Sequence, residues 1–402
     1  MDPIAVVSHR DVPPDPSIAD AVGTHHDLPT ALADLVDNAI DAGAGRVHIR
    51  FLTSGGALTG LLVIDDGRGM DAAVIDAAMT FARRRNYGER DLGHYGLGLK
   101  AASLSQADVL DVLSRAVGGV PVGRRIARDR PTRVETLDPR QVGESLAAPL
   151  SRIPGASPSH GTVVRWHDVR TALSSPDPDE RAEWLSGCIE EVRAHLGLVF
   201  HRILQRSAIE VSVDEFDLDI GEAGAMRRVR VLDPLARGVT GVRPIPLDGA
   251  VNGRPFELTG VVLTERALQD PAILASARGS AAANGQGLYI YRRDRLLQIG
   301  GWDSIIREGR NWEYLRISLD IDDALLDVVQ VNPEKSGVVL DADMRRAVHS
   351  AVDGDGRSFA DLLDRARSAA SEARRRTRRP IALVEPGRGL SRQMYDAVAD
   401  AV

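Results

Sequence analysis

The sequence predicts an α/β protein of two or three domains, and three observations predict this class. The chain has 402 residues, whereas one domain typically takes about 100–200. Apolar residues make up 43% and charged residues 27%, which is typical of a globular protein with a buried core. Segments with the apolar spacing of helices alternate along the chain with segments patterned like strands.

Charge and cysteine content exclude several classes of protein. The formal net charge of −7 lacks the basic balance of a dedicated nucleic-acid coat, so any contact with DNA would require a local patch. The single cysteine permits no intrachain disulfide, and no Cys/His spacing predicts a structural zinc site. The N-terminus lacks a signal-peptide pattern, and no apolar run reaches 18 residues. We therefore expect a cytoplasmic protein without a membrane segment.

The first predicted element is a helix over residues 30–42. Its apolar face is formed by Leu32, Leu35, Val36 and Ala39. The opposite face carries Asp34, Asn38 and Asp41, with Asp37 beside them and no Lys or Arg. Such a stripe is usually a solvated helix face, but oxygen ligands without a countercharge also suit a hard cation such as Mg²⁺.

Two strands of a hairpin are predicted next, over 47–51 and 58–70. The second runs into Asp65-Asp66-Gly67-Arg68-Gly69-Met70. The glycines there indicate either a tight turn or a close approach of a planar base to the backbone, with Asp65 accepting a hydrogen bond from an exocyclic amine. A helix follows over about 71–82.

A glycine-rich turn then opens a second apolar helix. It contains Gly93, Gly96, Gly98 and Lys100. Free N–H groups at a helix N-terminus commonly bind phosphate. Only two of the 50 basic residues are lysines, Lys100 and Lys335, and a lysine ammonium makes compact contacts with phosphate.

Four motifs in this order resemble the nucleotide-binding motifs of the GHKL ATPases, the superfamily of gyrase, the ninety-kilodalton heat-shock chaperone, histidine kinases and MutL. They are DLVDNAIDAGA, DDGRGM, LGHYGLGLKAAS and HGTVVRW. Within the superfamily the chain resembles MORC-type and related bacterial ATP-binding proteins in particular. The resemblance implies a Bergerat-type α/β sandwich that binds ATP and Mg²⁺.

The resemblance also implies a role for each matching residue. Asn38 would coordinate Mg²⁺, Asp65 would bind the adenine amine, and Thr162 would join Asp65 through a water molecule. The base pocket would be shaped by Gly67, Gly69 and Met70, and the phosphates would be held by Gly93, Gly96, Gly98 and Lys100.

The general base of most hydrolysing relatives is a glutamate four residues before the asparagine, a position that Asp34 takes here. Aspartate is shorter by about 1.5 Å. The chain is therefore interpreted as an ATPase, with a non-hydrolysing ATP switch as the alternative and Asp37 as another candidate base. A histidine-kinase-like phosphotransferase is disfavoured, because no phospho-acceptor hairpin precedes the first motif.

Domain boundaries are predicted from a proline-rich linker and a long helix that begins near 178. Residues 1–177 would form the ATP-binding domain, 178–340 a transducer-like α/β domain, and 341–402 a helical segment. Strand-like runs occur at 209–214, 228–232, 256–263, 287–292 and 314–320. Segments 287–297 and 328–338 resemble the transducer domain, which implies that Lys335 reaches the γ-phosphate.

The resemblance further implies a lid at about 82–97 whose closure couples ATP binding to homodimer formation. The client is left open between DNA and a protein complex. Five of the nine residues in the run 372–380 are arginines that would suit a phosphate backbone or an acidic partner, although a solvated helix end is the alternative.

The two lysines are expected to differ in effect. Lys100→Ala should weaken ATP binding itself, because the ATP module loses a positive charge that stabilises the bound triphosphate. Lys335→Ala should leave that affinity unchanged but slow phosphate release and weaken the closed or dimeric state. Light scattering with a non-hydrolysable ATP analogue measures the closed or dimeric state, and a steady-state assay measures phosphate release. A Lys335→Ala protein that closes and hydrolyses like the wild type would make Lys335 an ordinary surface lysine.

Overall fold

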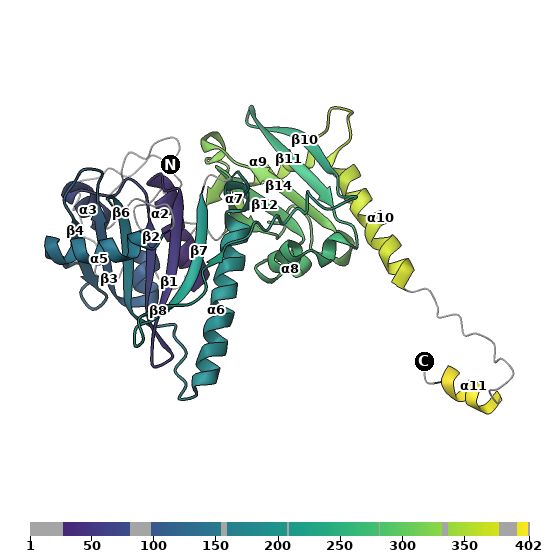
Figure 1. Cartoon of the computed structure of the whole chain (residues 1–402). Coiled ribbons are helices and arrows are strands. Elements are labelled where there is room, and N and C mark those ends of the chain that lie inside the picture. Colours follow the sequence, from purple (N-terminus) through teal and green to yellow (C-terminus); the bar gives the residue numbers. More distant parts are fainter. Residues whose placement is uncertain are drawn as a thin grey trace, which may run out of the picture.

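The computed structural model describes residues 27–80, 98–153, 159–206, 209–280, 282–331, 337–377 and 392–400. It confirms the α/β class. Two units follow one another along the chain, each with its own sheet and hydrophobic core (Figure 1). The long helix α6 (Pro178–Val199) lies between them (Figure 1).

The first unit is built on a sheet that has nine strands within the described residues, in the order β5-β4-β3-β6-β2-β1-β7-β8 with β9 paired to β7. The strands are β1 (Arg46–Ser54), β2 (Ala57–Asp65), β3 (Ala107–Arg115), β4 (Val122–Ala127), β5 (Val134–Thr136), β6 (Gly161–Val169), β7 (Glu210–Asp217), β8 (Glu222–Ala223) and β9 (Arg227–Arg228). The predicted β1–β2 hairpin is present, but β2 ends at Asp65 rather than near residue 70. The following turn bends the chain away, and Gly69 has a φ of +67° that strands do not adopt.

Helices cover both faces of this sheet. One face packs against α2 (Leu28–Asp41), α3 (Ala72–Met79), α4 (Gly98–Gln106) and α6. The other face packs against α5 (Pro139–Ser151) through Val142, Leu146 and Leu150. The predicted first helix is thus α2, which is capped by the Asp27 carboxylate accepting from the N–H of Thr30 at 2.9 Å.

Helix α6 begins at the predicted position, but its packing belongs to the first unit. Ile189, Val192 and Leu196 lie in the same core as α2 and β1. Beyond it, α7 (His201–Gln205) leads to β7, which pairs with β1 in parallel. The boundary near residue 178 remains a prediction, and this packing leads us to propose that the first unit extends to about residue 229.

The second unit contains a five-stranded sheet in the order β10-β11-β14-β12-β13 and a separate β15–β16 pair within the described residues. The strands are β10 (Pro244–Val251), β11 (Arg254–Val262), β12 (Gly287–Arg292), β13 (Arg295–Ile299), β14 (Leu315–Asp320), β15 (Val329–Val331) and β16 (Val338–Leu340). Its helices are α8 (Pro271–Arg278), α9 (Ala342–His349) and α10 (Phe359–Thr377). Helix α11 (Arg392–Ala399) lies apart from this unit (Figure 1). Single 3₁₀ turns are η1 (Ala267–Gln269), η2 (Ala283–Gly285), η3 (Arg310–Trp312) and η4 (Asp323–Leu325).

The C-terminal segment is helical, as expected, but it is not one continuous helix. Helices α9 and α10 are separated where Val352 makes a β-bridge to Asp248 of β10. The apolar side of α10 packs on the second unit along most of its length, through Leu362 and Ala366 and then through Ala370 and Ala373. In the part of the chain that the structure describes, no helix has the length and apolar character needed to cross a membrane.

Candidate functional site

Asp65 lies at the end of β2, where the strand register places it opposite Val47 of β1 on one side and Thr162 of β6 on the other. It is 7% exposed, and its Oδ1 accepts the backbone N–H of Gly67 at 2.9 Å. Burial raises the pKa of this carboxyl to about 7, and Asp66 adds to the rise while the Gly67 N–H opposes it. A buried carboxylate that titrates near neutrality marks a candidate functional site.

Ser114 of β3 connects three parts of this site. Its Oγ accepts the backbone N–H of Met70 at 2.8 Å and lies 2.9 Å from Thr162 Oγ1 and 3.1 Å from the carbonyl oxygen of Gly161. Sequence reasoning missed Ser114, because it lies in no motif. Only the β3–β6 pairing, which places it opposite Thr162, reveals its position.

Gly67 and Gly69 are required by close protein packing. A Cβ on Gly69 would lie 1.9 Å from the carbonyl oxygen of Arg115, and the residue has a φ of +67°. A Cβ on Gly67 would lie 2.8 Å from both Asp65 Oδ1 and Ala42 Cβ. The glycines thus let the turn after β2 pass directly over the end of α2 and the end of β3.

The acidic face of α2 meets the N-terminus of α4. A Cβ on Gly98 would lie 3.6 Å from Asp34 Oδ2, so the first turn of α4 passes beside this carboxylate. Asn38 is exposed, whereas Asp34 and Asp37 are buried. Among the described residues no three His, Cys, Asp or Glu side chains are arranged to hold a metal ion, so a cation at Asn38 would depend on ligand oxygens.

Lys100 is fully buried, although the sequence suggested a phosphate contact. Its Nζ donates to the carbonyl oxygens of Ala78 at 2.8 Å and Thr80 at 2.6 Å, at the end of α3. This ammonium is therefore placed at the first turn of α4, with its described donors directed to backbone. Gly93, Gly96 and Lys335 lie outside the described residues.

Arg295 of β13 reaches from the second unit to α2. Its Nε lies 2.9 Å from Asp37 Oδ1 and 2.7 Å from Oδ2, and its Nη2 lies 3.8 Å from Asp34 Oδ1. All three side chains are at most 3% exposed. Arg295 lies in the transducer-like segment 287–297, but nothing in that segment distinguished it from Arg292 and Arg293, because its role depends on how the two units pack.

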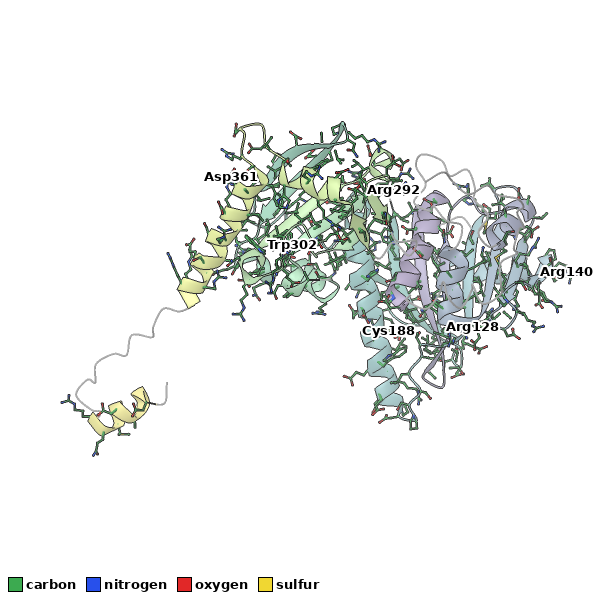
Figure 2. The ribbon with its side chains drawn as sticks, turned by 180° about the vertical axis from the view of Figure 1, so that it is seen from behind. Arg128, Arg140, Cys188, Arg292, Trp302 and Asp361 are labelled. Carbon is green, nitrogen blue, oxygen red and sulfur yellow. The ribbon has the colours of Figure 1, made fainter. Side chains whose placement is uncertain are left out.

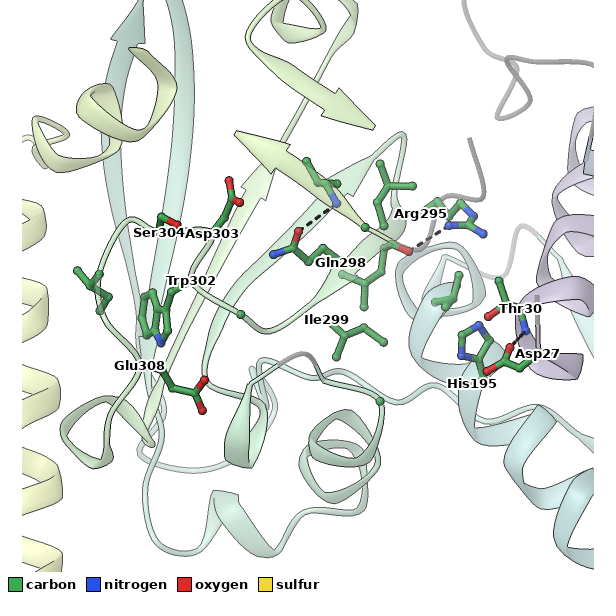
Figure 3. Close-up of a pocket in the computed structure, with 18 of the residues that line it drawn as sticks. Asp27, Thr30, His195, Arg295, Gln298, Ile299, Trp302, Asp303, Ser304 and Glu308 are labelled. Atoms are coloured by element: carbon green, nitrogen blue, oxygen red, sulfur yellow. Dashed lines mark hydrogen bonds between the residues drawn. The ribbon is translucent and has the colours of Figure 1, made fainter. Parts of the chain in front are cut away.

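A cavity of about 850 Å³ lies beside this contact, between α2, α6 and β13 (Figure 3). His195 of α6 lines it next to Asp27, with Arg295 farther along the wall (Figure 3). The pKa of His195 is lowered to about 4, chiefly by removal from water, with a raising effect of Asp27 and a smaller lowering effect of Arg295. His195 is thus neutral at pH 7 and adds no charge to the cavity.

Comparison with known proteins adds a family assignment for the first unit. Residues 26–137 match the model of the family described as histidine kinase-, DNA gyrase B- and HSP90-like ATPases. The DNA mismatch repair protein MutL of Rhodospirillum rubrum is 39% identical over 324 residues, which cover 77% of this chain and 45% of that protein.

Two further similarities are shorter or weaker. The ATPase MORC2 of Homo sapiens is 40% identical over 87 residues, which cover 20% of this chain and 8% of that protein. A crystal structure of the N-terminal domain of a DNA repair protein covers 90% of this chain and 98% of its own, with 16% identity and a TM-score of 0.45. The chain spans less than half the length of the curated relatives that it matches.

The close approach at Gly69 predicts a large effect of one methyl group. Gly69→Ala should destabilise the site and abolish nucleotide binding, because its Cβ would collide with the Arg115 carbonyl. Gly118→Ala is the matched control, since its φ of +69° is almost the same but no atom lies within 4 Å of the added carbon. Thermal unfolding and ATP titration of both variants test this, and equal behaviour would show that the close approach is unimportant.

The raised pKa of Asp65 predicts a pH dependence of base binding. If the adenine amine donates to this carboxylate, as the resemblance implies, binding requires the ionised form and weakens as the pH falls through about 7. For adenosine, which has no phosphate to titrate, affinity should fall about tenfold between pH 8 and pH 6. Calorimetry of the wild type measures this. Asp65→Asn should bind adenosine weakly and without this step, and a flat wild-type profile would contradict the assignment.

Proposed function

Because the chain belongs to the GHKL superfamily of ATPases, we propose that it binds ATP with Mg²⁺ and hydrolyses it between α2, the turn after β2 and the start of α4. One observation carries this proposal: motifs far apart in the sequence come together on one side of the first sheet. The end of β2 contacts the end of α2 at Ala42, and the start of α4 lies beside Asp34. Asp65 and Thr162 are neighbours across β2 and β6.

The proposed base end of the site is formed by Asp65, Thr162 and Ser114. A buried carboxylate and two hydroxyls are suited to accept from an amine directly and through water. The phosphate end is formed by the N-terminus of α4, whose free N–H groups favour an anion. The exposed amide of Asn38 would be a ligand for Mg²⁺, which supplies charge neutralisation on phosphate oxygens when bound.

Lys100 lies where α4 joins the end of α3. Two N–H donors of its ammonium bind the carbonyl oxygens of Ala78 and Thr80. A phosphate held by Lys100 would therefore act at the link between these two helices. We propose that ATP binding changes the conformation of the chain at this link and that the change is coupled to homodimer formation. The predicted lid at about 82–97 lies outside the described residues.

Arg295 gives the second unit a direct contact with the proposed catalytic helix. A carboxylate at Asp34 would position or deprotonate the attacking water, and Asp37 would hold Arg295 next to it. The proposed client is DNA or a protein complex, and similarity to a mismatch repair protein supports DNA.

Substitution of Asp34 separates hydrolysis from the alternative of a non-hydrolysing switch. Asp34→Asn should still bind MgATP, while phosphate release falls at least 100-fold, the effect typical of losing a general base. Asp34→Glu should keep or raise turnover. Steady-state phosphate release and calorimetry of the three proteins test this. No turnover in the wild type would support the switch, and equal turnover in Asp34→Asn would assign the base elsewhere, with Asp37 as the next candidate.

A further inference from the structure

A second, smaller cavity lies on the opposite face of the first sheet from α2. Its volume is about 260 Å³, and it is lined by α5, by strands of the sheet and by Phe216 and Leu218, with an opening to solvent at Ser145. Leu52, Leu62, Leu113 and Val163 provide an apolar floor. At about 30 Å³ for each water-sized group, the cavity has room for about nine such groups. It is separated from the proposed ATP site by the full thickness of the sheet.

The charged residues that line this cavity are all arginines: Arg50, Arg152 and Arg165. Arg50 is paired with the buried carboxylate of Asp214, through Nε at 2.8 Å and Nη2 at 2.5 Å. Arg152 lies at the end of α5, and its guanidinium carbon is 4.8 Å from the ring centre of Phe216. Within the described part of the chain, no carboxylate pairs with Arg152 or Arg165.

Arg165 does not pair with the carboxylate that the strand register places opposite it. Asp111 lies directly opposite it on β3. However, Asp111 accepts from Arg125 at 2.6 and 2.8 Å and from His167 at 2.8 Å, which occupies both of its oxygens. Arg165 Nε is buried with no hydrogen-bond partner in the described structure. Residues 154–158 contain no Asp or Glu that could serve instead.

An anion in the cavity would relieve two unfavourable features at once. A buried guanidinium N–H without an acceptor is costly, and nearby cations repel each other. A carboxylate or phosphate oxygen is the acceptor that arginine binds most strongly. The apolar floor would in turn remove hydrocarbon from water. Free phosphate would contact only the arginines of the cavity, and a neutral lipid would contact only its apolar floor.

We propose that this cavity binds an amphiphilic organic anion, with its carboxylate or phosphate group at Arg152 and Arg165 and its hydrocarbon part against the strands. The site is independent of ATP. Octanoate is a suitable probe because it combines one carboxylate with a short apolar chain. Octanol has the same chain without the charge, and inorganic phosphate has charge without a chain.

Calorimetry of the full chain with the three probes tests the proposal. Octanoate should bind saturably with one site, at least tenfold more tightly than octanol or phosphate, and saturating ATP should not displace it. Arg165→Gln should weaken octanoate at least tenfold. Arg140→Gln is the matched control, because Arg140 lies on the same helix α5, at the outer edge of the molecule and away from the cavity lining (Figure 2).

A variant at the exposed opening of the cavity distinguishes loss of the binding site from loss of folding. Ser145→Phe places a ring from α5 into the cavity and should block octanoate while leaving the thermal unfolding temperature nearly unchanged. Absence of saturable octanoate binding would overturn the proposal. Equal affinity of Arg165→Gln and Arg140→Gln, displacement by ATP, or equal binding of octanol or of phosphate would also overturn it.

Discussion

The contact between Arg295 and Asp37 ties the two units together at the proposed catalytic helix. Both side chains are almost completely buried, at 3% and 0% exposed, and each places an opposite charge directly against the other. Burial of an ion pair is not a net source of stability, but removing one partner leaves a buried charge at a cost of about 3–5 kcal/mol. The arrangement of the units is therefore fixed more by the need to keep this pair together than by the gain from making it. A motion of β13 away from α2 would separate Arg295 from Asp37.

Asp34 makes this dependence relevant to nucleotide binding. It lies 3.8 Å from the same guanidinium and beside the first turn of α4, where phosphates are proposed to bind. A triphosphate there would add negative charge to a region that already holds two carboxylates. This would increase the attraction on Arg295 and favour the second unit staying close to α2. The neighbouring cavity of about 850 Å³ leaves space in which the two units can adjust.

The sequence was sufficient to predict those parts of the site that lie within one helix or one hairpin. Spacing predicted helix α2 and the β1–β2 hairpin, though not the end of β2 at Asp65, because local periodicity determines which side chains share a face. It did not predict Ser114 or Arg295, since both act through contacts between segments distant in the chain. The same limit applies to α6, whose apolar residues pack in the core of the first unit. Its amphipathic pattern predicts a helix but does not say which core receives its apolar side. The lysine contacts on phosphate were inferred from resemblance, and the described bonds of Lys100 to Ala78 and Thr80 leave that role a prediction.

Strand β1 shows how one sheet can serve two separate sites. Val47, Ile49 and Phe51 face the core beneath α2, while His48 and Arg50 face the other side. Alternation of this kind normally indicates a solvated face. Here His48 and Arg50 are buried, because the parallel strand β7 places Ser212 and Asp214 opposite them as hydrogen-bonding partners. Asp214 therefore has its pKa lowered by Arg50 and His48 in spite of burial, which keeps it ionised and holds Arg50 in place. Asp214 therefore offsets the charge of Arg50, and the positive charge of the smaller cavity beside α5 comes from Arg152 and Arg165. Arg165 lies opposite Asp111, whose carboxylate already accepts from Arg125 and His167.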